Sequence, residues 1–318
     1  MDGDFEKLIG HDKYKDTLID FITFRCFGKL NKTDVVAMAQ QIRAGKMSSS
    51  DALSLISDKI PAQKRNDEYN AARSQARIND IAKYEGLMQD VKTYLDVGCG
   101  DGTITAAIGK HLRLKKDAII GVDVDAWAGH SHGDETSQDI DFRPIKTSGT
   151  IPVESNTIDF VTANMVFHHI PDDDLIKTLD DINRCMKDGA ILFLREHDSP
   201  NHMIDSLVNI EHGIFEVAIE KLSDVKKFQE SYFGRYKSSR DWIQLLSMFG
   251  FEQIGDIIAR PKGTRPFIAA FRKNKNAELL TQMTTANTRF IARNMGIKST
   301  SSLSSNAVKR AIVQGRRK

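Results

Sequence analysis

The 318-residue sequence has no long apolar run and only three cysteines. No apolar stretch approaches the roughly 20 residues that a membrane-spanning helix needs, so we expect no membrane association. Cys26, Cys99 and Cys185 show neither CxxC nor another metal-ligand spacing. An odd number of cysteines argues against a disulfide framework, and the lack of a metal-ligand spacing predicts no metal site. Reduced thiols favour a cytoplasmic setting.

The first residues also lack the features of a secretory signal. The segment MDGDFEKLIGHDKYK is charged throughout and contains neither an apolar core nor a small-residue cleavage site. Export is therefore not expected. Hydrophobic residues make up 40% and charged residues 28% of the chain, which is typical of an ordinary globular protein.

The net charge is only +2, but it is unevenly distributed. Residues 273–318 contain ten lysines and arginines and a single acid, Glu278, so this end carries +9 and the rest of the chain −7. We assign a basic tail to residues 274–318. One interpretation is an electrostatic handle for RNA or another polyanion. The other is a solvated, partly disordered terminus without a specific partner.

Residues 1–62 are predicted to form a small helical module. Apolar residues recur at helical spacing between Thr33 and Gly45, and again over residues 50–59. Such a module could serve as a docking site for a protein partner. Residues 63–92 are predicted to be a lead-in helix or linker.

From Thr93 onward short apolar runs alternate with helical segments, which is typical of βαβ units and a parallel sheet. The first run, Tyr94–Val97, leads directly into a turn that contains Gly98, Gly100 and Gly102. A strand that turns sharply into a helix against a ligand needs glycine, because glycine accepts a positive φ cheaply and lets the ligand approach the backbone. This turn is therefore a candidate cofactor site.

An acidic residue ends the second apolar run. Asp123 follows this run, 23 residues after Gly100. In dinucleotide-type folds an acid at about this position accepts hydrogen bonds from both ribose hydroxyls. Asp123 is therefore the predicted ribose ligand. Asp125 could share or take this role, and the alternative for Asp123 is a plain turn residue.

The segment from Leu95 to Gly102 resembles motif I of the class I S-adenosylmethionine (SAM)-dependent methyltransferases. Four further segments continue the similarity in the order and spacing of the methyltransferase type 11 pattern, over about residues 93–200. These segments are Ile151-Pro152, Thr157–Val161, Phe167–Pro171 and Ile182–Gly189.

The resemblance implies a Rossmann-like α/β fold over residues 93–273, flanked by the helical module and the basic tail. Its sheet is seven-stranded and mostly parallel, is covered by helices, and has an antiparallel last strand. SAM is expected across the carboxyl ends of the first, second and fourth strands, which is also where a doubly wound sheet forms its crevice.

The resemblance also implies roles for individual residues. Asp96 would contact the methionine end of SAM, and Asn164, Met165 and Val166 would lie at the sulfonium end. Where relatives hold the adenine amino group with an aspartate, this sequence has no acid, so Thr147 or a backbone group takes that contact. The predicted cofactor-binding residues are Asp96, Gly98, Cys99, Gly100, Gly102, Asp123, Val124, Thr147, Asn164 and Met165.

Ionisable residues follow the fourth and fifth strands. Methyl transfer from a sulfonium is an in-line displacement, so the protein supplies alignment and, for a weakly acidic nucleophile, a base. One interpretation makes these residues orient, deprotonate or bind the acceptor. The other makes them pair with neighbours and shape loops. The candidates are Arg195, Glu196, His197, Asp198 and His169.

A long insertion over residues 199–239 is predicted to cover the acceptor site as a lid. Its Tyr232–Lys237 stretch mixes aromatic and basic residues, which suits a nucleobase or cap-like acceptor, although aromatic residues in a lid also simply pack. We therefore predict a SAM-dependent methyltransferase acting on an oxygen or nitrogen of RNA or a 5′ cap. The alternatives are a small-metabolite methyltransferase and an inactive methyltransferase-fold subunit of a larger, possibly viral, assembly.

Overall fold

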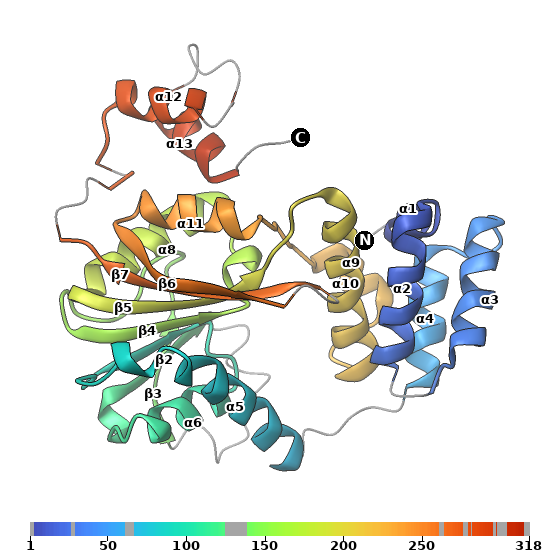
Figure 1. Cartoon of the computed structure of the whole chain (residues 1–318), viewed down its shortest axis with the longest axis horizontal. Helices are drawn as coiled ribbons and strands as arrows, with labels where there is room; N and C mark the ends of the chain where they lie inside the picture. The colour runs from blue at the N-terminus through green and yellow to red at the C-terminus, as the bar shows by residue number, and fades with distance from the viewer. Residues whose placement is uncertain are drawn as a thin grey trace. The chain divides into compact units, whose positions relative to one another are not determined.

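The computed structural model in Figure 1 describes most of the chain and divides it into two compact units. The helical unit comprises residues 1–65, 197–238 and 260–266, and the sheet unit comprises residues 66–196, 239–259 and 267–318. The described residues are 3–26, 29–60, 67–124, 139–260, 264–275, 279–280, 282–294, 297 and 304–314.

The sheet unit contains seven strands in the order β3-β2-β1-β4-β5-β7-β6. The strands β1 to β5 pair in parallel, whereas β6 and β7 pair antiparallel. The predicted Rossmann-like, mostly parallel sheet is therefore confirmed. The strands are β1 Tyr94–Val97, β2 Ile119–Val124, β3 Asp141–Ile145, β4 Ile158–Asn164, β5 Met186–His197, β6 Phe251–Ala259 and β7 Pro266–Lys273.

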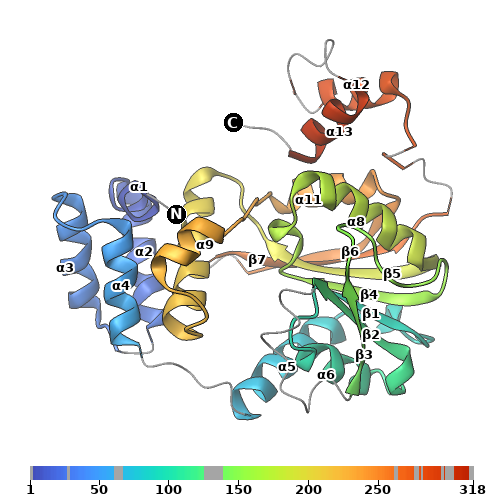
Figure 2. The ribbon, with the colours of Figure 1, turned by 180° about the vertical axis from the view of Figure 1, so that it is seen from behind.

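Helices cover both faces of this sheet. In both views α8 (Asp172–Cys185) and α11 (Ser239–Ser247) lie on one face, and α5 (Asp67–Ala82) and α6 (Thr103–His111) lie on the other (Figures 1 and 2). Short helices η1 (Glu85–Leu87), η2 (Lys116–Ala118) and η4 (Phe167–His169) complete the connections. No helix in the described parts of the chain is both long and apolar enough to cross a membrane.

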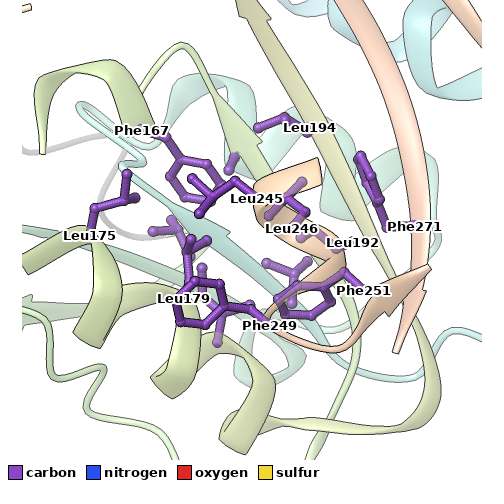
Figure 3. Close-up of a cluster of buried hydrophobic side chains, with 14 of the residues drawn as sticks. Phe167, Leu175, Leu179, Leu192, Leu194, Leu245, Leu246, Phe249, Phe251 and Phe271 are labelled. Carbon is purple, nitrogen blue, oxygen red and sulfur yellow. The ribbon is translucent and has the colours of Figure 1, made fainter. Parts of the chain in front are cut away.

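Two hydrophobic cores hold the sheet between these helices. All four residues of β1 are buried, as expected for a parallel strand covered on both faces. Because successive side chains point to opposite faces, Leu95 and Val97 pack on the α8 side and Tyr94 on the α6 side. Figure 3 shows the larger core, where Leu179 of α8 and Leu245 of α11 surround the sheet residue Leu192.

The switch point of the sheet lies at β1. This strand pairs with β2 on one side and β4 on the other, so the chain order reverses there. In doubly wound sheets the connections at a switch point leave a crevice at the carboxyl ends of the strands. The glycine turn after β1 therefore begins where a ligand site is expected.

The helical unit combines the N-terminal segment with the long insertion. The N-terminal helices are α1 (Asp4–Ile9), α2 (Asp12–Arg25), α3 (Lys32–Arg43) and α4 (Ser49–Lys59). The insertion adds α9 (His202–Gly213), the π-helix η5 (Ile214–Ile219) and α10 (Val225–Ser231). Helix α1 contacts α9, and α4 contacts both η5 and α10.

The two helices predicted within residues 1–62 are present as α3 and α4. Each begins with a capping box, formed by Asn31 with Asp34 and by Ser48 with Asp51, which satisfies the first free amides of the helix. The N-terminal helices and the insertion share one hydrophobic core, to which Ile22, Ile56, Leu207, Val217 and Phe228 all contribute. The two segments that were predicted as a module and a lid therefore pack as one body.

The described part of the basic tail is folded. It forms α12 (Thr285–Asn294) and α13 (Ser305–Gln314), and α13 contacts α8. Val308, Ile312 and Val313 of α13 are buried in the larger core of the sheet unit. The interpretation of a solvated terminus is therefore wrong for α13. The basic residues 316–318 lie outside the described residues.

Candidate functional site

The turn between β1 and α6 contains three glycines with positive φ, at 75° for Gly98, 54° for Gly100 and 72° for Gly102. A Cβ atom at Gly98 would lie 2.4 Å from Val166 Cγ2, and one at Gly102 would lie 2.6 Å from Ile140 Cδ1. Packing alone therefore requires these two glycines. A Cβ at Gly100 would have no described atom within 4 Å, so Gly100 faces open space at the carboxyl end of β1.

Asp123 lies at the end of β2, directly against this turn. The Gly100 amide donates a hydrogen bond to Asp123 Oδ2 at 2.7 Å, and the Val124 amide donates to Oδ1 at 2.8 Å. The structure thus brings the predicted ribose ligand and the glycine turn together. The side chain of Val124 is exposed, and the alternative ligand Asp125 lies outside the described residues.

Asp96 is a buried carboxylate whose contacts come from neutral groups. Its oxygens accept hydrogen bonds from Thr105 Oγ1 at 2.6 Å and Thr162 Oγ1 at 2.5 Å. Burial raises the pKa of Asp96 to about 6, although these two hydroxyls and the nearby Asn164 side chain partly counter that effect. A buried carboxylate without a cationic partner among these contacts is suited to receive an ammonium group.

Sequence reasoning missed the two threonines that hold Asp96. Thr162 interrupts the apolar run from Phe160 to Ala163 in β4, and Thr105 is a fully buried polar residue in the first turn of α6. A polar residue within an apolar run was the available signal. Only the fold shows that both hydroxyls face the same carboxylate, and that the Tyr94 hydroxyl extends the network to Thr162 at 2.7 Å.

The segment after β4 also lies against the glycine turn. Val166 packs on Gly98, and Met165 has a φ of 56°, a left-handed conformation that costs a residue other than glycine about 1–2 kcal/mol. The Met165 amide donates to the Arg195 carbonyl oxygen at 2.8 Å. Asn164 Nδ2 is buried and makes no hydrogen bond of ordinary geometry with any described residue. The predicted sulfonium end therefore contains a strained residue and a buried amide that lies near Asp96.

Two other predicted cofactor residues have different surroundings. Cys99 is buried, packs toward Gly121 of β2, and has a pKa raised by that burial. It shapes the turn rather than presenting its thiol to solvent. Thr147 is exposed beyond the end of β3, where its carbonyl oxygen accepts a local hydrogen bond from the Thr150 amide at 2.9 Å.

The predicted catalytic residue Glu196 is fully buried near the end of β5. Its Oε1 accepts hydrogen bonds from the backbone amides of Phe167 at 2.8 Å and His168 at 3.4 Å. Its Oε2 lies 2.6 Å from His168 Nδ1. Glu196 therefore binds the short helix η4 that follows β4. This partner could not be identified from the sequence, because it lies 28 residues away on another strand connection.

The remaining catalytic candidates lie in separate environments. Arg195 is half-buried, and His169 is exposed, with its ring centroid 4.0 Å from that of His168. In the helical unit, His197 Nδ1 lies 3.0 Å from the Thr264 carbonyl oxygen, and Asp198 forms an ion pair with Arg265 at 2.9 Å. The four consecutive residues 195–198 therefore do not form one cluster.

The aromatic stretch of the insertion is bonded within the helical unit. The Tyr232 and Tyr236 hydroxyls bond to each other, and the Tyr236 hydroxyl donates to Asn209 Oδ1 at 2.9 Å. Asn209 Nδ2 in turn donates to Asp4 Oδ2 at 2.9 Å. Burial raises the pKa of the Tyr236 hydroxyl, so it stays neutral. These tyrosines connect the insertion to α1.

Comparison with known proteins places most of the sheet unit in a recognised family. Residues 64–254 match the methyltransferase domain family. No curated protein shows significant similarity to this chain.

Several solved structures are similar. A SAM-dependent methyltransferase from Methanosarcina mazei has 17% identity and a TM-score of 0.44, over 60% of this chain and 97% of that one. A SAM-dependent methyltransferase from Aquifex aeolicus has 17% identity and a TM-score of 0.41, over 61% and 89%. The YcgJ protein of Bacillus subtilis has 14% identity and a TM-score of 0.44, over 62% and 99%.

Proposed function

The chain belongs to the methyltransferase domain family and is a SAM-dependent methyltransferase, and on this basis we propose that SAM binds across the carboxyl ends of β1, β2 and β4. The observation that carries this site is the open space beside Gly100. Packing against the described residues does not explain that glycine, whereas a cofactor lying on its backbone would. The positive end of α6 faces the same region, which favours a carboxylate there.

The polar groups around this space fit the charges of SAM. We propose that Asp96 receives the ammonium group, because it is a buried carboxylate held by neutral hydroxyls. Asp123 would accept the ribose hydroxyls. Asn164, whose buried side-chain amide lies near Asp96, would donate to the methionine end. Thr147 or a neighbouring backbone group would contact adenine.

When bound, SAM supplies an electrophilic methyl group on a positively charged sulfur. The chain's own residues align that methyl group with the acceptor. Val166 packs against the glycine turn and, with the preceding Met165, would form the apolar wall of the sulfonium end. An apolar wall excludes water, which would otherwise compete with the acceptor for the space in line with the bond that breaks.

For the acceptor, we propose a small molecule. An RNA acceptor would need exposed aromatic rings for stacking and a free basic tail. Instead, the Tyr232 and Tyr236 hydroxyls are used in internal hydrogen bonds, and α13 of the tail buries its apolar residues against the sheet unit. The two tyrosines and α13 thus have structural uses, whereas Phe233 of the same stretch is exposed. The three glycines and Asp123 argue against a subunit that has lost SAM binding.

The test is incubation of the full chain with methyl-labelled SAM and separate small-molecule, protein and RNA fractions of a cell extract. We expect label in the small-molecule fraction. Label in RNA, with binding that weakens steeply as salt rises, would support the RNA function instead. Calorimetric binding of SAM without label in any fraction would indicate an inactive subunit. Absence of SAM binding would contradict the cofactor site itself.

A further inference from the structure

A cavity of about 530 Å³ lies in the sheet unit at the end of α6. Its lining comes from η1 and the two residues that follow it, and from the last residue of α6 and the two that follow it. Helix α6 begins at the glycine turn and has nine residues, so its two ends lie roughly 12 Å apart at about 1.5 Å per residue. The cavity is therefore separate from the proposed cofactor site.

The apolar part of the cavity lining is supported by a hydrophobic core. Met88 and Leu112 supply it, and both belong to or pack against the core that contains Tyr84 and Ile108. The Tyr84 hydroxyl donates to the Asp256 carbonyl oxygen at 2.6 Å, which ties the start of η1 to β6. Small-molecule sites typically combine such an apolar surface with a few polar groups, in volumes of roughly 300–1,000 Å³.

The end of α6 also concentrates basic residues. Five of the seven residues 110–116 are basic and exposed, and among the described residues none of the five has an ion-pair partner. Two of them lie in the last turn of α6, where they favour the negative end of the helix dipole, but the other three lie beyond it. The five are Lys110, His111, Arg113, Lys115 and Lys116. An anion at this place would reduce their mutual repulsion.

The backbone after α6 brings Arg113 to the cavity. Arg113 has a φ of 59°, a left-handed conformation for which glycine is the favoured residue at helix ends. Its amide donates to the Lys110 carbonyl oxygen at 3.0 Å, and the Leu114 amide donates to that of Gly109 at 3.0 Å. These bonds occupy carbonyl oxygens that would otherwise repel an anion at the end of a helix.

We propose that this cavity is a second ligand site, which binds a small phosphate monoester with an apolar body. A phosphate monoester carries about −1.5 to −2 charges at neutral pH, so it suits several cations better than a carboxylate does. The planar guanidinium of Arg113 would hold two phosphate oxygens, and His111 would donate an N–H to the phosphate. Met88 and Leu112 would contact the body. The site goes beyond the function proposed above and does not depend on it.

Glu85 and Gln89 complete the polar lining and restrict the ligand further. The Glu85 carboxylate repels a phosphate, so we expect a hydrogen-bond donor of the ligand body near Glu85. Gln89 can both donate and accept. The two polar ends of the ligand are thus expected to differ, with the phosphate toward Arg113.

The first measurement is calorimetric titration of the full chain with phenyl phosphate, with and without saturating S-adenosylhomocysteine. We expect binding of the same affinity in both cases. Phenol, which lacks the charge, and inorganic phosphate, which lacks the body, should each bind about tenfold more weakly or less. Loss of phenyl phosphate binding when S-adenosylhomocysteine is present would place the probe in the cofactor site and overturn the proposal. Equal affinity for phenol would overturn the role of the cations.

Three variants test the lining of the cavity. Arg113→Gln keeps a residue other than glycine at the left-handed position, and it should lower phenyl phosphate affinity about tenfold or more. Glu85→Gln removes a repulsive charge and should raise the affinity. Gly86→Leu should abolish binding, because Gly86 lines the cavity, has no left-handed φ, and has no described atom within 4 Å of an added Cβ.

The matched control is Arg43→Gln, which removes an exposed arginine from the last turn of α3. It should leave phenyl phosphate affinity unchanged, and denaturant unfolding should show that every variant is folded. The proposal fails if phenyl phosphate does not bind the natural sequence. It also fails if affinity stays the same in both Arg113→Gln and Gly86→Leu, or falls equally in Arg43→Gln.

A last comparison distinguishes the sources of the phosphate group. An RNA oligonucleotide with a 5′ phosphate and the same oligonucleotide with a 5′ hydroxyl are used to compete with phenyl phosphate. We expect neither to displace it. Displacement by both would assign the cations to a nucleic-acid backbone, with an affinity that falls steeply as salt rises. Displacement by the phosphorylated form alone would assign the cavity to an RNA end. Either result would overturn a small-molecule site.

Discussion

Replacing Gly100 by alanine should have two effects, a loss of stability from backbone strain and a loss of SAM affinity from the added methyl group. Comparison with a second glycine separates the two. Gly100 has a φ of 54° and no described atom within 4 Å of an added Cβ. Gly189 in β5 has the same two properties, with a φ of 78° and no such neighbour. The two substitutions therefore introduce the same kind of strain in the same unit, but only Gly100 adjoins the proposed cofactor.

The expected magnitudes differ for folding and for binding. A left-handed conformation costs an alanine about 1–2 kcal/mol, so both variants should lose a similar amount of stability. At Gly100 the new methyl group occupies the space where the cofactor would touch the backbone. We expect SAM affinity to fall at least tenfold in Gly100→Ala, which corresponds to about 1.4 kcal/mol, and to be unchanged in Gly189→Ala.

Denaturant unfolding and calorimetric titration with SAM measure the two quantities separately. The reasoning requires that both variants unfold at similarly reduced denaturant concentrations and that only Gly100→Ala binds SAM more weakly. Equal SAM affinities in the two variants would show that the open space beside Gly100 is not part of the cofactor site. A loss of affinity in both would point to a general loosening of the sheet unit.

Three further predictions concern other parts of the sheet unit. The pKa of Asp96 is raised from its ordinary 3.8 to about 6, so its ionised form costs the cofactor-free protein about 3 kcal/mol. The free energy of unfolding should therefore rise as pH falls from about 6 toward 4, while SAM affinity falls over the same range. In Asp96→Asn, denaturant unfolding and calorimetry should show neither pH dependence. Gly98→Ala should lower the free energy of unfolding because its Cβ would lie 2.4 Å from Val166 Cγ2. In denaturant unfolding, the double variant with Val166→Ala should recover part of that loss. Additive losses from the two substitutions would contradict the contact. Ile312→Ala should lower the free energy of unfolding by about 2–5 kcal/mol because Ile312 is 1% exposed in the core, and an unchanged midpoint would mean that α13 does not pack in solution.

Much of the sheet unit could be predicted from sequence because its signals are local. The strand Tyr94–Val97 was predicted with the same bounds that the structure shows. The run of glycines after the first strand needed no distant information, since a positive φ is a property of the residue itself. The resemblance to a known family then implied the seven-stranded, mostly parallel sheet with its antiparallel last strand.

The helical unit could not be predicted in the same way. Its contacts join residues that are far apart in sequence, as when Ser206 Oγ donates to Asp4 Oδ1 at 2.7 Å across 202 positions. Sequence periodicity shows that a helix has an apolar face but not which other helix covers it. The N-terminal helices and the insertion were therefore predicted as two pieces, although they share one core.

Residues 195–198 were interpreted as one catalytic cluster because they are adjacent in sequence. In a strand, however, the side chains of adjacent residues are separated. Successive side chains along β5 point to opposite faces of the sheet. Glu196 consequently turns toward η4, while His197 contacts the Thr264 carbonyl oxygen in the helical unit. A run of ionisable residues at a strand end predicts a polar region, but alternate residues have different partners.

Features that lower stability without any gain in packing lie close together in the sheet unit, and the first is a strained backbone conformation. Among the residues that the structure describes, four others besides Met165 have a positive φ without being glycine, namely Arg113, Asn156, Lys221 and Arg265. Each of those is polar, and such residues are tolerated at helix ends and turns. Met165 is apolar and follows directly after a central strand, where strain requires a separate reason.

The buried carboxylate of Asp96 lies at the adjacent strand end and carries a second, independent cost, because burial opposes its charge. Gly100 adds a third, since a glycine facing open space loses backbone entropy on folding without any gain in packing. Natural sequences break local rules chiefly where a site demands it. Three unrelated violations at the carboxyl ends of β1 and β4 therefore favour a bound cofactor there on grounds that do not depend on the family resemblance.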